Sequence, residues 1–274
     1  MKRHSFKSAI PALTALLVLV ACQKDPIENP DTLPPQQEFP NPLPANALVK
    51  KLVWSENDHQ TFTYNSKGQV ARLTSQWQYV EGDPTKIRVI TYDFQYDAQD
   101  RPVQVNTTGG FSVKYYYNGD LVGKTEELYP GGTVAKEVTY AYDNGRLIRE
   151  NWRVSGLPGE PDNFYRHVFA YDSKGNLNKV ATYERMANLQ YKLLQISEYS
   201  DFDDKINPTS WMLRYPFLPQ ARYQYNNPRR EVLRSPGGEA ETTVHAYKYD
   251  DQGRPYAKRT TTPSGGVLSV KFEY

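Results

Sequence analysis

One short phrase recurs along this chain: an aromatic residue, any residue, a tyrosine, and then a tight turn rich in Asp, Asn and Gly. Clear copies span Phe62–Gly68, Phe169–Gly175 and Tyr247–Gly253, and looser copies span 94–101, 115–120 and 140–146. The repeat tyrosines follow one another at intervals of about 21 to 32 residues, enough for two strands and two turns. Because a short repeat buries its apolar face only against its neighbours, this pattern fixes the architecture before any single residue is considered.

Alternation of apolar and polar residues predicts that residues 48–274 consist of strands. Ile90, Tyr92, Phe94 and Tyr96 share one face of such a strand, and the same period of two recurs elsewhere. The abundant Tyr, Val, Thr and Phe suit a pleated, half-buried surface. The stretch 183–199 also resembles a helix, and we interpret it as a hairpin that turns near Asn188.

Two kinds of turn alternate along the chain. In the first, Asp172 follows the repeat tyrosine and is suited to bond the backbone two residues on, and Gly175 takes the left-handed position. Asp100 replaces that glycine in another copy. The second kind is rich in Gly and Pro, as in Pro130-Gly131-Gly132. This predicts an antiparallel meander with tyrosine turns along one edge and Gly-Pro turns along the other.

The predicted fold class is all-β, with tandem β-hairpins laid side by side in sequence order. A single hairpin is marginal in water, so neighbouring hairpins must pair their edges. About sixteen strands are too many for an open flat sheet. We therefore expect a strongly twisted, coiled or partly closed sheet.

The N-terminus reads as a targeting segment. Basic residues precede an apolar run over 9–20 that is too short for a membrane span. The run ends in Leu19-Val20-Ala21-Cys22, which resembles the lipobox of bacterial lipoproteins and contains the only cysteine of the chain. The resemblance implies cleavage before Cys22 and lipid attachment to it, with an ordinary secretory signal as the alternative. Residues 1–21 are thus the expected signal peptide, 22–47 a Pro-rich tether and 48–274 the repeat domain.

Composition argues against nucleic-acid binding. Removal of residues 1–21 takes away three basic residues and no acidic one, so the net charge falls from +2 to about −1. No basic block remains that would attract a phosphate backbone. The expected membrane contact is instead the lipid on Cys22, because the prolines of 22–47 favour an extended tether rather than a core.

Few residues point to catalysis or metal binding. His167 and His245 both lie on aromatic faces, where they either form a metal or acid–base pair or replace an aromatic residue of the repeat, which we favour. The acidic cluster Asp201, Asp203 and Asp204 lacks the spacing of a calcium loop and predicts a capped turn. We predict no catalytic residue, metal or cofactor. Carboxylates brought together only in space would still permit a hydrolase.

An irregular stretch at 207–220 interrupts the repeat. Long loops on a regular scaffold often carry function. Trp211, Tyr215 and Phe217 in this stretch are therefore the predicted contact surface for a glycan or a protein. The alternative is a loop that covers one end of the sheet.

The turn phrase resembles a known repeat. It resembles the YD repeat of RHS proteins. Tyr249–Pro255 is a nearly complete copy of that repeat, and Tyr142–Leu147 is a copy one residue shorter. In RHS proteins such hairpins wind into a spiral β-sheet that sometimes encloses a toxin. The chain is more similar to Bacteroidota lipoproteins with YD-like repeats behind a Pro-rich tether, because Phe202–Pro208 resembles one of their segments. The resemblance implies a fold and a location, and no activity.

These observations predict a lipid-anchored outer-membrane protein, periplasmic or surface-exposed, that acts as a non-enzymatic binding or scaffolding module. The alternative is a carbohydrate-active or other hydrolytic enzyme with dispersed carboxylates. A transmembrane barrel is disfavoured because Lys86, Arg88 and Lys136 lie within predicted strands and the mean hydropathy is −0.74.

Overall fold

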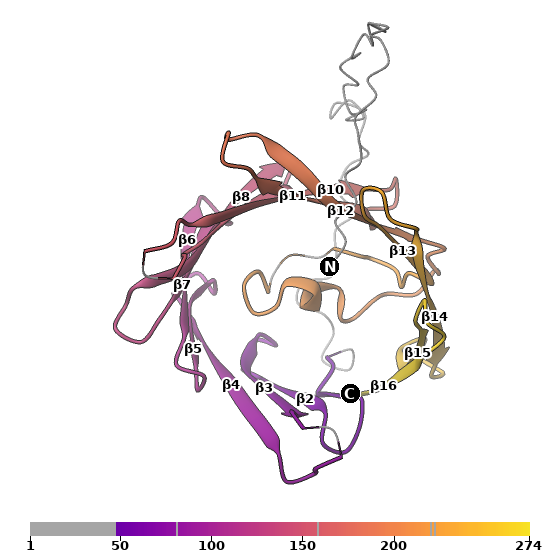
Figure 1. Ribbon diagram of the computed structural model, residues 1–274. Coiled ribbons are helices and arrows are strands. Elements are labelled where there is room, and N and C mark those ends of the chain that lie inside the picture. Colours follow the sequence, from indigo (N-terminus) through magenta and orange to yellow (C-terminus); the bar gives the residue numbers. More distant parts are fainter. Residues whose placement is uncertain (1–47, 81, 158, 220, 222) are drawn as a thin grey trace, which may run out of the picture. The chain divides into compact units, whose positions relative to one another are not determined.

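The computed structural model describes residues 48–274, apart from 81, 158, 220 and 222, as a closed antiparallel barrel of 16 strands (Figure 1). Every strand pairs with its neighbours in sequence, and β1 pairs with β16 to close the barrel. The all-β meander is thus confirmed, and closure is complete rather than partial. The strands are β1 (Lys51–Val53), β2 (His59–Tyr64), β3 (Val70–Gln78), β4 (Ile87–Tyr96), β5 (Pro102–Thr107), β6 (Ser112–Asn118), β7 (Leu121–Leu128), β8 (Val134–Asp143), β9 (Arg146–Val154), β10 (Asn163–Tyr171), β11 (Leu177–Arg185), β12 (Tyr191–Ser200), β13 (Arg230–Arg234), β14 (Glu241–Tyr249), β15 (Pro255–Thr261) and β16 (Val267–Glu273).

The barrel has two unlike ends. Because consecutive strands are antiparallel, the turns after β2, β4, β6, β8, β10 and β14 all lie at one end, which we call the tyrosine end, and the Gly-rich turns lie at the other, the glycine end. The predicted division of turns is therefore confirmed. So is the hairpin at 183–199, because β11 ends at Arg185 and β12 begins at Tyr191.

The repeat tyrosines lock neighbouring hairpins together at the tyrosine end. In six of them the hydroxyl donates a hydrogen bond to a backbone carbonyl at or just before the start of an earlier strand, a bond that phenylalanine could not make. Tyr249 instead donates to the Asp203 carboxylate. A β-bulge precedes the repeat tyrosine in most hairpins. The bonds run from Tyr64 to Val49 (2.6 Å), Tyr96 to Val70 (2.7 Å), Tyr117 to Pro102 (2.7 Å), Tyr142 to Val122 (3.0 Å), Tyr171 to Leu147 (2.9 Å) and Tyr274 to Pro255 (2.9 Å).

The tyrosine turns have the predicted chemistry. The Asp172 Oδ1 atom accepts hydrogen bonds from the backbone N–H of Lys174 at 2.9 Å and of Asn176 at 2.8 Å. Gly175 has φ +86°, and Asp100 takes the same left-handed conformation with φ 63°. The sequence of this turn therefore specifies its backbone directly.

Gly175→Ala is expected to destabilise the protein by about 1–2 kcal/mol, because a β-carbon disfavours left-handed backbone. A β-carbon there would meet only Arg146 Nη2 at 3.7 Å, so crowding adds little. The urea midpoint measures the effect. Gly238→Ala is the matched control, because Gly238 has no positive φ and its added β-carbon would lie 3.6 Å from its nearest neighbour. Equal midpoints for the two variants would contradict the turn assignment.

The described residues of 201–229, all but 220 and 222, leave the meander between β12 and β13 and run inside the barrel, where they form a short 3-10 helix, η3 (Ser210–Arg214) (Figure 1). We call them the inner segment. Its rings pack on the inner wall: Trp211 lies 5.6 Å from Phe62 and Tyr215 lies 5.1 Å from Phe94, measured between ring centroids. This packing places the hydrophobic core inside the barrel.

Hydrogen bonds also fasten the inner segment to the wall. The Tyr115 hydroxyl donates to the Pro216 carbonyl, and the Leu177 N–H donates to the Tyr223 carbonyl at 2.5 Å. Where the segment enters, Asp203 Oδ1 accepts from the backbone N–H of Lys205 at 3.0 Å. The predicted capped turn at this acidic cluster is therefore confirmed.

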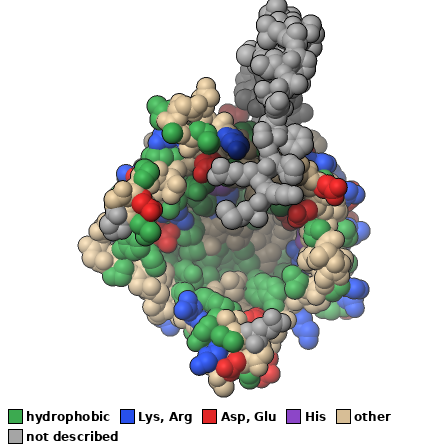
Figure 2. Space-filling model, in the orientation of Figure 1, with side chains coloured by type: hydrophobic (Ala, Val, Ile, Leu, Met, Phe, Trp, Pro, Cys, Tyr) green, Lys and Arg blue, Asp and Glu red, His purple; other side chains and the backbone are tan. Residues whose placement is uncertain are grey.

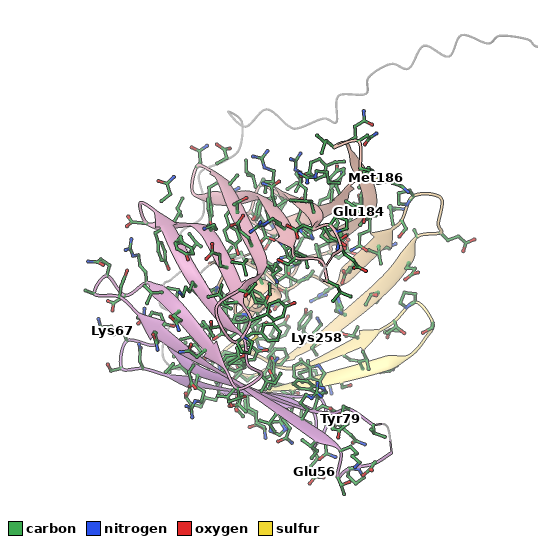
Figure 3. The ribbon with its side chains drawn as sticks, turned by 60° about the vertical axis from the view of Figure 1, so that its left-hand side comes forward. Glu56, Lys67, Tyr79, Glu184, Met186 and Lys258 are labelled. Atoms are coloured by element: carbon green, nitrogen blue, oxygen red, sulfur yellow. The ribbon has the colours of Figure 1, made fainter. Side chains whose placement is uncertain are left out.

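The glycine end of the barrel interior is more open. Figure 2 looks into the barrel and shows a hollow whose visible wall is mostly green, for hydrophobic side chains, and tan, for other side chains and the backbone. In Figure 3, Lys67 marks the tyrosine end and Tyr79 and Glu56 mark the glycine end. The inner segment and the hollow thus divide the barrel interior into a packed part and an open part.

Candidate functional site

Charged side chains gather where the inner segment meets β7 to β10, and we call Glu127, Lys136, Glu150, His167 and Arg214 the inner charge cluster. Strand register places the first four on the inner face: Lys136 lies opposite Glu127, and His167 lies opposite Glu150. Arg214 comes from η3. The cluster therefore ties the wall to the inner segment.

The acidic members each lie beside a cation. Lys136 Nζ is 3.1 Å from Glu127 Oε2, and Arg214 Nη2 is 3.6 Å from Glu150 Oε2. The indole N–H of Trp152 donates to Glu150 Oε2 at 3.0 Å. Glu150 is only 2% exposed, so it depends on these two partners in place of water.

Burial sets the protonation of this cluster. Desolvation raises the pKa of Glu150, and Arg214 and the Trp152 hydrogen bond oppose the rise. Desolvation, together with the nearby cations Arg214 and Lys136, lowers the pKa of His167 to about 3. His167 is therefore neutral at physiological pH, and its ring packs on Trp152 with 4.6 Å between centroids.

His167→Phe is expected to flatten the acid side of the stability profile. The folded pKa of about 3 lies below the unfolded value of 6.5, so the stability contributed by neutral His167 is complete above pH 6.5 and is lost as pH falls toward 3. Between these values the variant should lose a slope of up to about 1.4 kcal/mol per pH unit. Unfolding free energies from pH 4 to 7 measure it. His245→Phe should act more narrowly, because the pKa of His245 is about 4, and an unaltered slope in His167→Phe would refute the assignment.

A second inner cluster lies on the opposite run of strands, β12 to β15. Its members are Tyr199, Glu231, His245 and Lys258, and His245 Nδ1 lies 3.0 Å from Thr260 Oγ1. Burial raises the pKa of Glu231 and lowers that of Lys258, while each charge opposes the shift of the other. Both clusters thus pair their charges within the barrel.

The two histidines do not form the pair that the sequence left open. His167 is on β10 and His245 on β14, four strands apart, and each has its own neighbours. The hypothesis that His167 and His245 share a metal or acid–base site is therefore wrong. No group of three or more His, Cys, Asp or Glu among the described residues is arranged to hold a metal ion.

The predicted contact residues lie in the inner segment. Trp211 is 6% exposed, Tyr215 packs beside it at 4.6 Å, and the Phe217 ring lies 3.9 Å from Lys136 Nζ. This packing matches a loop that fills one end of the barrel, and contact of these three residues with a ligand stays a prediction. Cys22, the signal peptide and the tether lie outside the described residues.

A ring of uncharged polar side chains lines the inner wall toward the glycine end. Strand register places each member on the same face of the sheet as a buried residue. Thr107 pairs with Tyr92, which in turn pairs with the buried Leu73, and Gln60 pairs with the buried Leu52. Sequence reasoning missed this ring, because the inward direction of a polar residue is known only after register is known. The members are Gln60, Ser75, Thr107, Tyr165, Thr243 and Thr260.

No helix in the described part of the chain is long and apolar enough to cross a membrane. No protein-family model and no curated protein matches the sequence.

The barrel is similar to solved structures. A porin-like protein from Bacteroides uniformis aligns with a TM-score of 0.57 at 13% identity, covering 82% of this chain and 97% of that chain. A porin-like protein from Bacteroides vulgatus gives 0.50 at 14% identity, with coverages of 83% and 98%. A TcdB2-TccC3-TEV structure gives only 0.28 at 14% identity, over 74% of this chain and 12% of that one, which leaves the resemblance to RHS repeats unconfirmed. What this chain shares with the two Bacteroides proteins is the fold.

Proposed function

We propose that this protein is a non-enzymatic, lipid-anchored barrel of the bacterial cell envelope that binds a neutral glycan in the open part of its interior. The observation that carries the proposal is the set of polar side chains around Gln60, Thr107 and Tyr165, while Glu127 and Glu150 in the same interior each lie beside a cation. Hydroxyl and amide groups match the hydroxyls of a sugar, and partly exposed aromatic rings such as Tyr165 offer stacking faces.

The envelope location rests on two supports. The Leu19–Cys22 motif resembles a lipobox, and lipid on Cys22 would anchor the chain to a membrane. The structural neighbours from Bacteroides are described as porin-like, which fits a protein of the cell envelope.

The names of these neighbours also suggest a membrane-spanning pore, and the outer face of this barrel argues against it. Lys114, Glu126, Glu137 and Arg153 lie in register across β6 to β9 on the face opposite the buried Tyr115 and Thr125. Charges in the middle of a lipid-facing strand are destabilising. We therefore infer that the wall of the barrel does not span the membrane.

A hydrolytic function has less support than binding. Glycoside hydrolysis needs two carboxyl groups that face each other across the scissile bond. Among the inner carboxylates, Glu127 and Glu150 each lie beside a cation, Lys136 and Arg214. The charge of Lys258 likewise favours the ionised form of Glu231. Pairing with a cation stabilises these carboxylates and makes them weaker bases.

A glycan array probed with the full chain in detergent micelles tests the proposal. Tyr165→Ala, on the inner face of β10, should weaken binding of any neutral glycan hit about tenfold or more. Tyr116→Ala is the matched control, because Tyr116 is 41% exposed and lies on the outer face. An array without neutral glycan hits, or equal losses in both variants, would reject an interior glycan site.

A further inference from the structure

Large apolar side chains protrude from the turns at the glycine end. The turn between β9 and β10 presents Leu157, 69% exposed, and the turn between β11 and β12 presents Leu189, 70% exposed. Others follow around the same end of the barrel, and we call the whole set the apolar rim. Its members are Trp54, Tyr79, Val80, Tyr129, Leu157, Met186, Leu189, Val267 and Leu268.

The tyrosine end lacks such a rim. Its turns carry polar side chains such as Lys67, Asp100 and Lys174. Exposed large apolar residues near these turns, within the described chain, are fewer and include Leu121 at 39%, Ile206 at 41% and Tyr256 at 45%. The apolar rim is therefore a property of one end and not a general feature of the turns.

Leu189 is held in an unfavourable backbone conformation. Its φ is +65°, the left-handed region that glycine and asparagine adopt more readily, and its N–H donates to the Met186 carbonyl at 2.9 Å to close the turn. A leucine there gains little by burial within this chain, because 70% of it is exposed. Burial within the chain therefore does not account for a leucine at this position.

We propose that the apolar rim docks on the surface of the lipid bilayer. Docking turns the open end of the interior toward the bilayer, so the neutral glycan of the proposed function would be one carried on a membrane lipid. The apolar side chains are spread singly around the barrel end, whereas a peptide or small ligand would need a continuous groove. Trp54, Tyr79 and Tyr129 add the amphipathic rings that favour the membrane–water interface. The same turns carry charges of both signs, such as Lys86 and Glu160, so the docking is apolar rather than electrostatic.

The length of the chain before the barrel permits this orientation. Val49 lies at the tyrosine end, where its carbonyl accepts from Tyr64. Residues 22–47 would span up to about 80 Å if extended, and a ten-residue strand spans only about 33 Å. A lipid on Cys22 and the apolar rim can therefore reach the same bilayer, although the tether joins the opposite end of the barrel.

Tryptophan quenching by brominated phosphatidylcholine tests the docking. The full lipid-anchored chain is reconstituted in vesicles, and the signal of Trp54 is the difference between wild type and Trp54→Phe. We expect this signal to be quenched in the wild type and the quenching to fall about threefold or more in the double variant Leu157→Asp/Leu189→Asn. The double variant should unfold at the same urea concentration or higher, because asparagine suits the left-handed turn position.

A matched pair of substitutions at the other end provides the control. Leu121→Asp/Tyr256→Asp should leave Trp54 quenching unchanged, because both residues lie at the tyrosine end. Unquenched Trp54 in the wild type would overturn the proposal, as would an equal loss in the two double variants. A dimer formed through the apolar rims would also overturn the proposal. It would be seen as a doubled mass in the wild type that Leu157→Asp abolishes, with Trp54 unquenched.

Discussion

Trp211→Ala is expected to lower the free energy of unfolding by about 3–5 kcal/mol, the cost of deleting a large aromatic side chain from a packed core. Trp211 is 6% exposed, packs against Phe62 and Tyr215, and donates its indole N–H to the Pro208 carbonyl at 2.9 Å. The truncation would leave a cavity between the inner segment and the wall. Urea unfolding followed by circular dichroism measures the change.

Trp54→Ala is the control for this experiment, because Trp54 is 47% exposed. Its loss should change the free energy of unfolding by no more than about 0.5 kcal/mol. An unchanged midpoint for Trp211→Ala together with lost ligand binding would instead support the contact surface predicted from the sequence.

Arg214→Met is expected to cost about 2–4 kcal/mol at neutral pH, because it leaves Glu150 buried without its cation. Trp152 alone would then remain as a hydrogen-bond donor to the carboxylate. The loss should shrink in acid: burial already raises the pKa of Glu150, and a protonated carboxyl needs no cation. Urea titrations at several pH values measure both effects.

A double-mutant cycle separates the charge from the packing. Glu150→Gln in the Arg214→Met background should recover more than half of the loss, since the two sites act on one interaction. Arg234→Met is the surface control: Arg234 pairs with Glu198 at 3.0 Å but is 53% exposed, and its loss should cost about 0.5 kcal/mol or less. Full additivity of Arg214→Met and Glu150→Gln would refute a direct interaction.

Most of the fold is local and was therefore accessible from the sequence. The turns at Asp172–Gly175 and near Asn188 follow from short-range chemistry, and the period of two follows from the pleat. Complete closure was not accessible, because it depends on β1 meeting β16 across the whole chain.

The interior site was harder to predict for the same reason. Glu150 and Arg214 are ordinary charged residues in the sequence, and 64 positions separate them. Their meeting depends on the inner segment turning into the barrel rather than away from it. Trp211 did mark that segment as exceptional, but an apolar residue in a break of the repeat suits a ligand contact and a filled core equally.

The junction of β1 with β16 has a consequence for how the barrel assembles and opens. The other pairings join neighbours in sequence and, apart from β12 with β13 across the inner segment, form over short turns at low entropic cost. This one joins opposite ends of the domain. It rests on only three residue pairs, Lys51–Glu273, Leu52–Phe272 and Val53–Lys271. We expect the β1–β16 pairing to form last during folding and to break first under denaturing conditions. Its amide protons should therefore exchange sooner than those between the other paired strands.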